Sequence, residues 1–132
     1  STALLANVLA KQQATKQGAF EALLVNTEGF ITEGSSTSVF WVKQEKLFVT
    51  PSGKNILPSI TRKILMEIAG ELGIETCQFA CRLEDLLKAD EVILAGTTTE
   101  AVSVTEIDEK VIGTGSPGVM VKRIRRAFLN RC

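Results

Sequence analysis

The chain contains no histidine and no tyrosine among its 132 residues. Without histidine, the Ser/His and Cys/His arrangements of nucleophilic catalysis cannot form within this chain. The absence also removes the commonest metal ligand of proteins, so we expect no metal site. Proton transfer must therefore depend on lysine, a carboxylate, a hydroxyl or a bound cofactor.

Cysteine is scarce, with only Cys77, Cys81 and Cys132. A small, odd number argues against a disulfide framework and is typical of a reducing compartment. Cys77 and Cys81 lie four residues apart in a segment that we predict to be a strand, so both should face the same side of it. Small buried thiols explain this pair better than a nucleophile does.

The balance of charge and the lack of long apolar runs also exclude several classes of partner. Fifteen basic residues balance fifteen acidic ones, so the net charge does not demand a polyanion. Basic residues gather near the end of the chain, but a helix dipole favours cations at a C-terminus and no aromatic residue lies within the cluster from Lys122 to Arg126. No apolar run approaches the ~18 residues of a membrane span, and the start does not resemble a signal peptide. We expect a cytoplasmic protein that binds a small neutral or zwitterionic ligand, and neither nucleic acid nor a membrane.

Hydrophobic periodicity predicts an α/β fold in one domain over residues 1–132, long enough to bury roughly two thirds of its unfolded surface. The spacing of Leu4, Leu5, Val8 and Leu9 predicts an opening helix that ends at Gly18. Further helices are predicted from Pro58 to Gly73, over 83–87 and over 119–129. Strands are predicted over 20–25, 37–42, 47–49, 74–80, 91–95 and 101–107. Most aromatic side chains are predicted to be core: Phe20, Phe30, Phe40, Trp41, Phe48, Phe79 and Phe128.

Three polar clusters fall at the ends of these elements, where an α/β domain usually gathers its ligand contacts. The first is Ile31-Thr32-Glu33-Gly34-Ser35-Ser36, whose carboxylate either meets a cation or only decorates a hairpin. The second is Ile56-Leu57-Pro58-Ser59-Ile60-Thr61-Arg62. There Ser59 can cap a helix and leave the Ile60 and Thr61 amides as an anion seat, or the helix start is ordinary. The third, Gly96-Thr97-Thr98-Thr99-Glu100, offers hydroxyl donors to the same anion or forms a polar turn.

Together, one carboxylate, one helix N-terminus and one threonine cluster match what pyridoxal phosphate needs, namely a partner for the ring nitrogen and a cradle for the phosphate. The order and spacing of the three motifs resemble the class IV aminotransferases, and the resemblance covers essentially the whole chain. The first twelve residues, Ser1-Thr2-Ala3-Leu4-Leu5-Ala6-Asn7-Val8-Leu9-Ala10-Lys11-Gln12, are most similar to the D-amino-acid (D-alanine) branch. Branched-chain aminotransferases are the nearest alternative, followed by aminodeoxychorismate lyases.

The resemblance implies a role for each motif. Glu33 would contact the pyridine nitrogen and keep it protonated. Leu57 would pack on the ring face, and the amides of Ile60 and Thr61 together with the Thr97 hydroxyl would bind the phosphate. The resemblance places two further residues near the substrate, Ser36 and Thr98.

The resemblance also implies a Schiff-base lysine immediately before Ser1, so the catalytic lysine is expected outside this chain. We expect either a true C-terminal fragment or a sequence interrupted at a cofactor-modified lysine. The family fold has two lobes, and the chain corresponds to the C-terminal large lobe, a mixed-sheet pseudo-barrel flanked by helices. Its expected partners are its own N-terminal lobe and a second copy in a homodimer. The non-enzyme alternative is a catalytically inert lobe.

Two residues of the second motif need separate comment. Ser59 stands where relatives commonly have glycine, and a positive φ there would cost roughly 1 kcal/mol, although helix capping makes serine acceptable. Arg62 either reaches the cofactor or pairs with a carboxylate behind it, and we favour the pairing.

Overall fold

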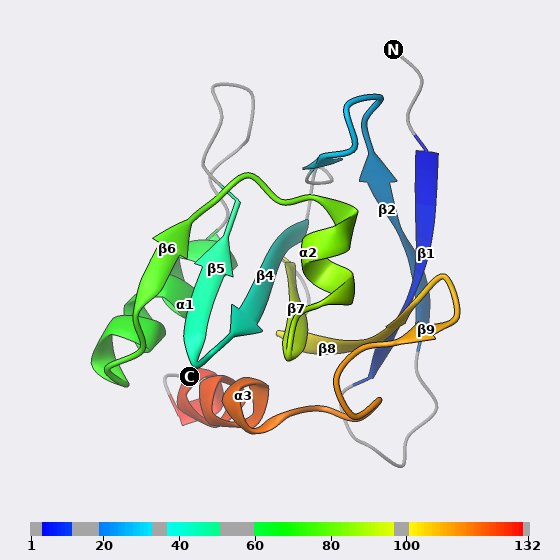
Figure 1. Cartoon of the computed structure of the whole chain (residues 1–132). Helices are drawn as coiled ribbons and strands as arrows, with labels where there is room; N and C mark the ends of the chain where they lie inside the picture. The colour runs from blue at the N-terminus through cyan, green and yellow to red at the C-terminus, as the bar shows by residue number, and fades with distance from the viewer. Residues whose placement is uncertain (1–3, 12–18, 33–36, 51–59, 97–100, 131–132) are drawn as a thin grey trace.

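The computed structural model describes residues 4–11, 19–32, 37–50, 60–96 and 101–130. In these residues, nine strands form one mixed sheet and three helices cover it (Figure 1). The strands are β1 (Leu4–Lys11), β2 (Ala19–Val25), β3 (Ile31–Thr32), β4 (Thr37–Lys43), β5 (Lys46–Val49), β6 (Thr76–Gln78), β7 (Glu91–Gly96), β8 (Val102–Ile107) and β9 (Lys110–Val111). The helices are α1 (Ile60–Glu71), α2 (Leu83–Leu87) and α3 (Val119–Asn130).

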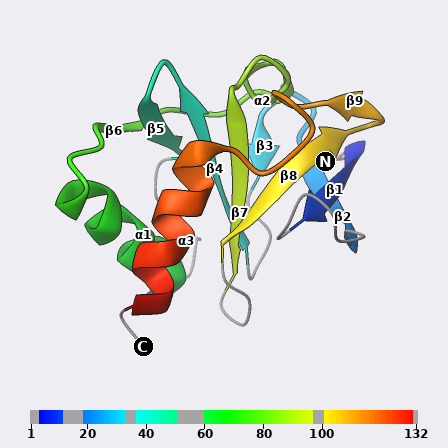
Figure 2. The ribbon, with the colours of Figure 1, turned by 90° about the horizontal axis from the view of Figure 1, so that it is seen from below.

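The sheet has the strand order β3-β2-β1-β8-β7-β4-β5-β6. β9 lies off this path and pairs with the last two residues of β8, Glu106 and Ile107. Neighbouring strands are antiparallel except for β5 and β6, which run parallel on either side of α1 in the sequence. The sheet twists and curls strongly, as Figures 1 and 2 show. α2 covers one face, while α1 and α3 lie side by side on the other. The mixed α/β class predicted from the sequence is confirmed.

The two central strands, β4 and β7, are buried on both faces. On one face Val39 and Trp41 pack with Val92 of β7 and Leu86 of α2. On the other face Phe40 and Val42 pack with residues of α1 and α3, including Leu65, Ile68, Val121 and Ile124. Burial of apolar area at about 25 cal/mol per Å² is the main force that holds these layers together. Because both faces are packed, the backbone ends of β4 and β7 are fixed points of the fold.

α1 ends as the sequence predicts. Gly73 has a φ of +73°, its amide bonds the Gly70 carbonyl, and the Ile74 amide bonds the Ala69 carbonyl at 2.8 Å. This pair of bonds is the Schellman arrangement, in which glycine takes the left-handed position and a hydrophobic residue follows. Ile74 is accordingly buried against the α1 side of the sheet.

The prediction of a helix at the start of the chain was wrong. Residues 4–11 form strand β1, which pairs with β2 on one side and β8 on the other. Ala6, Val8 and Ala10 are buried while Leu5 is 62% exposed, so burial alternates with the period of a strand. Apolar residues on both faces imitated a helical spacing, and the pairing with two strands decided the structure.

Other boundaries also differ from prediction. β6 contains only Thr76–Gln78, so Cys81 lies outside the strand of Cys77 and the expected shared face does not exist. Cys81 is buried as predicted, whereas Cys77 is only half-buried. Phe40 and Trp41 are core, but Phe79 is 55% exposed. The short strand β9 was not predicted. Across the part of the chain that is described, none of the helices is long and apolar enough to cross a membrane.

Candidate functional site

The first and third polar motifs join the sheet at a single cross-strand pair. Thr37, the first residue of β4, pairs with Gly96, the last residue of β7. The first motif ends one residue before Thr37, and the third begins at Gly96. Two positions 59 residues apart in the sequence, one after the first motif and one at the start of the third, are therefore neighbours on one edge of the sheet.

The chain leaves β5 toward the same side of the sheet, seven residues before the second motif begins. β5 runs antiparallel to β4, and its last residue, Val49, pairs with Phe40 in the middle of β4. The chain then returns at Ile60, where α1 begins. In Figure 2 the end of β7 and the starts of β4 and β8 lie on one side of the sheet, the lower one in that view. We call this side, defined by Thr37, Val49 and Gly96, the motif edge.

Arg62 connects α1 to the motif edge. It lies in the first turn of the helix and is only 7% exposed. Its guanidinium donates a hydrogen bond to the backbone carbonyl of Thr50, which directly follows β5. This bond fixes the start of α1 beside the end of β5. The expected pairing of Arg62 with a carboxylate stays a prediction.

The charge distribution at the start of α1 suits an anion. The first turn contains no acidic residue, and it carries Arg62. A helix N-terminus presents unpaired amide N–H groups and the positive end of the dipole, so a nearby carboxylate would have competed for them. A helix start of this kind, with a cation and no acidic residue in its first turn, favours a bound anion such as phosphate.

Most side chains predicted to form the site lie outside the described residues. Ile60 and Thr61 are the first two residues of α1, and their use as amide donors stays a prediction. The other predicted contacts are not placed, and their roles remain predictions: Glu33, Ser36, Leu57, Thr97 and Thr98.

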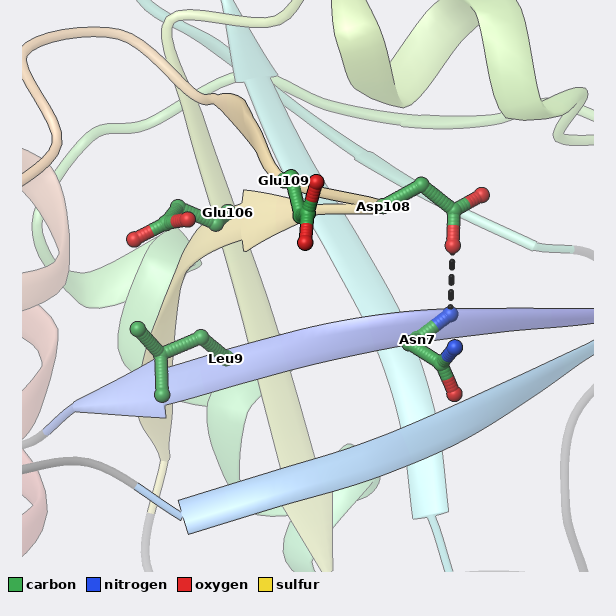
Figure 3. Close-up of a pocket in the computed structure, with 5 residues that line it drawn as sticks. All are labelled: Asn7, Leu9, Glu106, Asp108 and Glu109. Atoms are coloured by element: carbon green, nitrogen blue, oxygen red, sulfur yellow. Dashed lines mark hydrogen bonds between the residues drawn. The ribbon is translucent and has the colours of Figure 1, made fainter.

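A pocket of about 520 Å³ lies away from the motif edge (Figure 3). It is lined by Asn7, Leu9, Glu106, Asp108 and Glu109. Asp108 accepts a hydrogen bond from the Asn7 amide at 2.9 Å, and its own amide donates to the Asn7 carbonyl at 2.7 Å. The three carboxylates would repel a phosphate. β8 starts at the motif edge and ends at this pocket, so the pocket lies at the opposite end of the strand.

A second pocket, of about 290 Å³, lies between α2 and the sheet. Trp41 and Phe48 stack there with ring centroids 5.5 Å apart, and Phe79 meets Phe48 edge-on. Lys43 lines it at the end of β4 that points away from Thr37. Neither pocket therefore coincides with the motif edge.

Cys81 is not available as a nucleophile near neutral pH. Burial, and to a smaller extent the nearby Asp85 carboxylate, raises the pKa of its thiol to about 12. A thiol with that pKa is almost entirely protonated in neutral solution, and the protonated form is unreactive. Its packing in the α2 core explains its presence.

Sequence reasoning missed Thr50 as a component of the site. Its contribution is a main-chain carbonyl, so the side chain gives no signal, and Arg62 is twelve residues away. Only the fold brings the two together.

Comparison with known proteins gives a consistent family. The model of the family described as amino-transferase class IV matches residues 1–107. The chain is 39% identical to the D-alanine aminotransferase of Bacillus licheniformis over 127 residues, which are 96% of this chain and 44% of that protein. It is 40% identical to a putative branched-chain-amino-acid aminotransferase of Methanocaldococcus jannaschii, over 94% of this chain and 43% of that protein. The chain thus spans less than half the length of these relatives.

Solved structures agree with the sequence comparison. The Escherichia coli branched-chain amino acid aminotransferase superposes with a TM-score of 0.76 at 37% identity, over 82% of this chain and 36% of that one. The branched-chain enzyme of Thermobaculum terrenum, solved in its PLP form, superposes with a TM-score of 0.75 at 32% identity, over 83% of this chain and 36% of that one. The match of the family model over most of the chain, with these relatives and this fold, means that the chain belongs to the class IV aminotransferase family.

Proposed function

We propose that this chain is the cofactor-binding lobe of a pyridoxal-phosphate-dependent aminotransferase that moves an amino group from a D-amino acid, such as D-alanine, to a 2-oxo acid such as 2-oxoglutarate. The observation that carries the proposal is the pairing of Thr37 with Gly96, which places the residue after the first motif opposite the first residue of the third. Arg62 and Thr50 bring the start of α1 to the same edge. The PLP form of the Thermobaculum terrenum relative supports the choice of cofactor.

In this proposal the residues of the chain hold the cofactor and control its charge. Bound pyridoxal phosphate supplies the electron-withdrawing ring that accepts charge when the substrate loses its Cα proton. The carboxylate of Glu33 contacts the ring nitrogen and holds a proton there, because a nearby anion stabilises the cationic form of a base. Leu57 covers one face of the ring.

The phosphate is held at the start of α1. The amides of Ile60 and Thr61 donate to its oxygens, and the Thr97 hydroxyl adds a side-chain donor from the third motif. The first turn of α1 has no acidic residue to oppose this anion. In this proposal Ser36 and Thr98 contact the substrate.

Three parts of the proposal lie outside this chain. The lysine that carries the cofactor directly precedes Ser1, an N-terminal lobe covers the other side of the cofactor, and the active protein is a homodimer. Each follows from the family resemblance. The relatives, of which this chain spans less than half, have room for such a lobe.

A branched-chain amino acid aminotransferase is the second candidate. The identities to the D-alanine enzyme and to the putative branched-chain enzyme are 39% and 40%, a difference too small to choose between them. The solved structures named above are branched-chain enzymes. Much of the selection of the substrate depends on the lobe outside this chain, so substrate specificity is a question for direct assay.

The test is a substrate panel on the purified full-length protein. Transfer to 2-oxoglutarate is measured with D-alanine, L-leucine and L-valine, and the visible absorption band of bound cofactor is recorded before and after each addition. Faster turnover of D-alanine, with a change in the band, supports the proposal. Faster turnover of the L-amino acids supports the branched-chain candidate. A protein that shows no cofactor band and no transfer with added pyridoxal phosphate is an inert lobe, which contradicts both.

A further inference from the structure

The turn before β3 is held in one shape by its own residues. The Asn26 side-chain oxygen accepts hydrogen bonds from the amides of Glu28 and Phe30 at 2.9 and 3.0 Å. Gly29 has a φ of +90°, a conformation that a residue with a Cβ rarely adopts. The turn therefore reaches β3 with a defined backbone direction.

The guanidinium of Arg82, a residue far from the turn in sequence, lies over this turn. Its central carbon is 4.2 Å from the centroid of the Phe30 ring, a cation–π contact. One of its nitrogens donates to the Glu28 carbonyl at 3.2 Å. A Cβ at Gly29 would lie only 3.2 Å from the same nitrogen, so the glycine leaves room for the guanidinium. Arg82 thus contacts three consecutive residues of the turn. We call this set, Glu28 to Phe30 with Arg82, the arginine clamp.

The backbone of β3 depends on the same region. β3 has only two residues, paired on one side with β2. On the other side the Ile31 amide donates to the Cys81 carbonyl at 2.7 Å, and Phe30 forms an isolated bridge with Arg82. A two-residue strand contributes few ladder bonds of its own. Its position is therefore set by β2 on one side and by residues 81 and 82 on the other.

Arg82 is itself held in place by α2. The Asp85 carboxylate accepts the Arg82 amide at 2.8 Å, and the Asp85 amide donates to the Arg82 carbonyl at 3.0 Å. Both bonds use the backbone of Arg82, so they persist when its side chain is replaced. A substitution at Arg82 can therefore remove the guanidinium contacts while the start of α2 stays intact.

We propose that Arg82 is a positioning residue for the reaction: its guanidinium, held over Phe30 and the Glu28 carbonyl, fixes β3 and thereby the point from which Glu33 leaves the sheet. The inference rests on the proposed function of Glu33, which directly follows Thr32 of β3. The strength with which a carboxylate stabilises a protonated ring depends on their separation. Loss of the clamp relaxes that separation and lowers the pKa of the ring nitrogen, so the protonated form is lost at a lower pH.

The test replaces Arg82 by Met in the full-length protein, because methionine keeps an unbranched apolar stem and loses the charge and the donors. Arg123→Met on the exposed surface of α3 is the matched control. Arg82→Met is expected to lower kcat by about 10-fold or more, as a displaced catalytic group does. KM is expected to change by less than about two-fold, because binding of the substrate is not altered. The alkaline limb of the pH profile of kcat moves to lower pH. In the Arg123→Met control, kcat, KM and the pH profile are all expected to stay unchanged.

A double mutant separates positioning from a general loss of stability. In a Glu33→Gln background there is no carboxylate to position, so Arg82→Met should have little further effect on kcat. The same fold-loss in both backgrounds overturns the proposal, and so does a fall in Tm with unchanged kcat and pH profile. If Arg82→Met does not fold, Phe30→Leu removes the ring of the clamp and is judged by the same criteria.

The wild-type protein decides the proposed function separately. If it neither binds pyridoxal phosphate nor transfers amino groups, the proposed function fails before any variant is compared. If it does both and Arg82→Met behaves like Arg123→Met, only the arginine clamp fails.

Discussion

The Glu91 carboxylate accepts a hydrogen bond from the Met120 amide at 3.0 Å. Its second oxygen accepts the Val121 amide at 2.9 Å. Glu91 is the first residue of β7, and the two amides belong to the first turn of α3. A side chain from a strand therefore caps a helix that is distant in sequence, and it satisfies donors that have no partner within the helix. Because β7 ends at Gly96, this bond joins α3 to the strand that leads to the motif edge.

Replacing Glu91 by Ala should lower the free energy of unfolding by about 1.5–3 kcal/mol, the usual value for hydrogen bonds to a charged group. Urea unfolding of the chain measures it, and Glu28→Ala, which removes an exposed carboxylate, is the control with a change within about 0.5 kcal/mol. Gly118 provides a second check. A Cβ there would lie 2.3 Å from the Glu91 carboxyl carbon and must displace it. Gly118→Ala should therefore destabilise wild type more than it destabilises Glu91→Ala, and equal effects would contradict the cap.

Arg62→Met should both destabilise the chain and weaken the hold on phosphate. The substitution removes a buried donor to the Thr50 carbonyl, and loss of such a bond costs about 1–3 kcal/mol. The start of α1 is then less firmly held beside β5, so its amides are less well placed for an anion. Urea unfolding gives the first effect, and the dissociation constant for pyridoxal phosphate in the full-length protein gives the second. Arg123→Met, at an exposed position, controls for loss of charge; equal effects of the two variants would contradict this role of Arg62.

The sequence predicted the central part of the fold because the hydrophobic patterns there fitted only one type of secondary structure. Residues 91–95 are continuously apolar after Glu91, as expected of a strand buried on both faces, and β7 packs into both cores. α1 combines a helical apolar period with Gly73 as its stop, and no strand pattern fits it. The motif edge could be predicted as a set of motifs, since the ends of elements gather polar residues.

The parts that were not predicted depend on partners far away in sequence. β1 carries apolar residues on both faces, and only pairing with β2 and β8 makes Leu5 an outward residue. The arginine clamp joins Phe30 to Arg82 across fifty-two residues, and neither residue type signals the contact. Phe79 lies just past the end of β6, where alternation no longer determines burial. In each case a tertiary contact decided what a local pattern left open.

Cys81 should be inert to alkylation in the folded chain and should make stability fall at alkaline pH. Its pKa is raised from the ordinary 9.0 to about 12, so about one molecule in 10⁴ carries the thiolate at pH 8. The unfolded chain loses this proton near pH 9 and the folded chain keeps it to about pH 12. The unfolded state thus binds fewer protons in that window, and the free energy of unfolding falls as pH rises through it.

Two measurements check the behaviour of Cys81. Peptide mapping after brief treatment with iodoacetamide at pH 8 should find the half-buried Cys77 labelled before the buried Cys81. Urea midpoints between pH 8 and pH 10 should fall less steeply in Cys81→Ala than in wild type, with Cys77→Ala as the control. Early labelling of Cys81, or identical slopes in all three proteins, would show that the thiol is not protected.

Glu33→Gln should separate catalysis from capture of the cofactor. Glutamine has nearly the same size and can still hydrogen-bond, but it lacks the charge that keeps the ring nitrogen protonated. We expect kcat of the full-length protein to fall by about 10²-fold, which is typical when an electrostatic contact of the transition state is lost. The dissociation constant for pyridoxal phosphate should change much less, because the phosphate contacts at the start of α1 are untouched. Glu109→Gln, at an exposed position in the turn before β9, is the matched control. Unchanged transamination in Glu33→Gln would remove this role, and equal losses of turnover and cofactor affinity would assign Glu33 to binding alone.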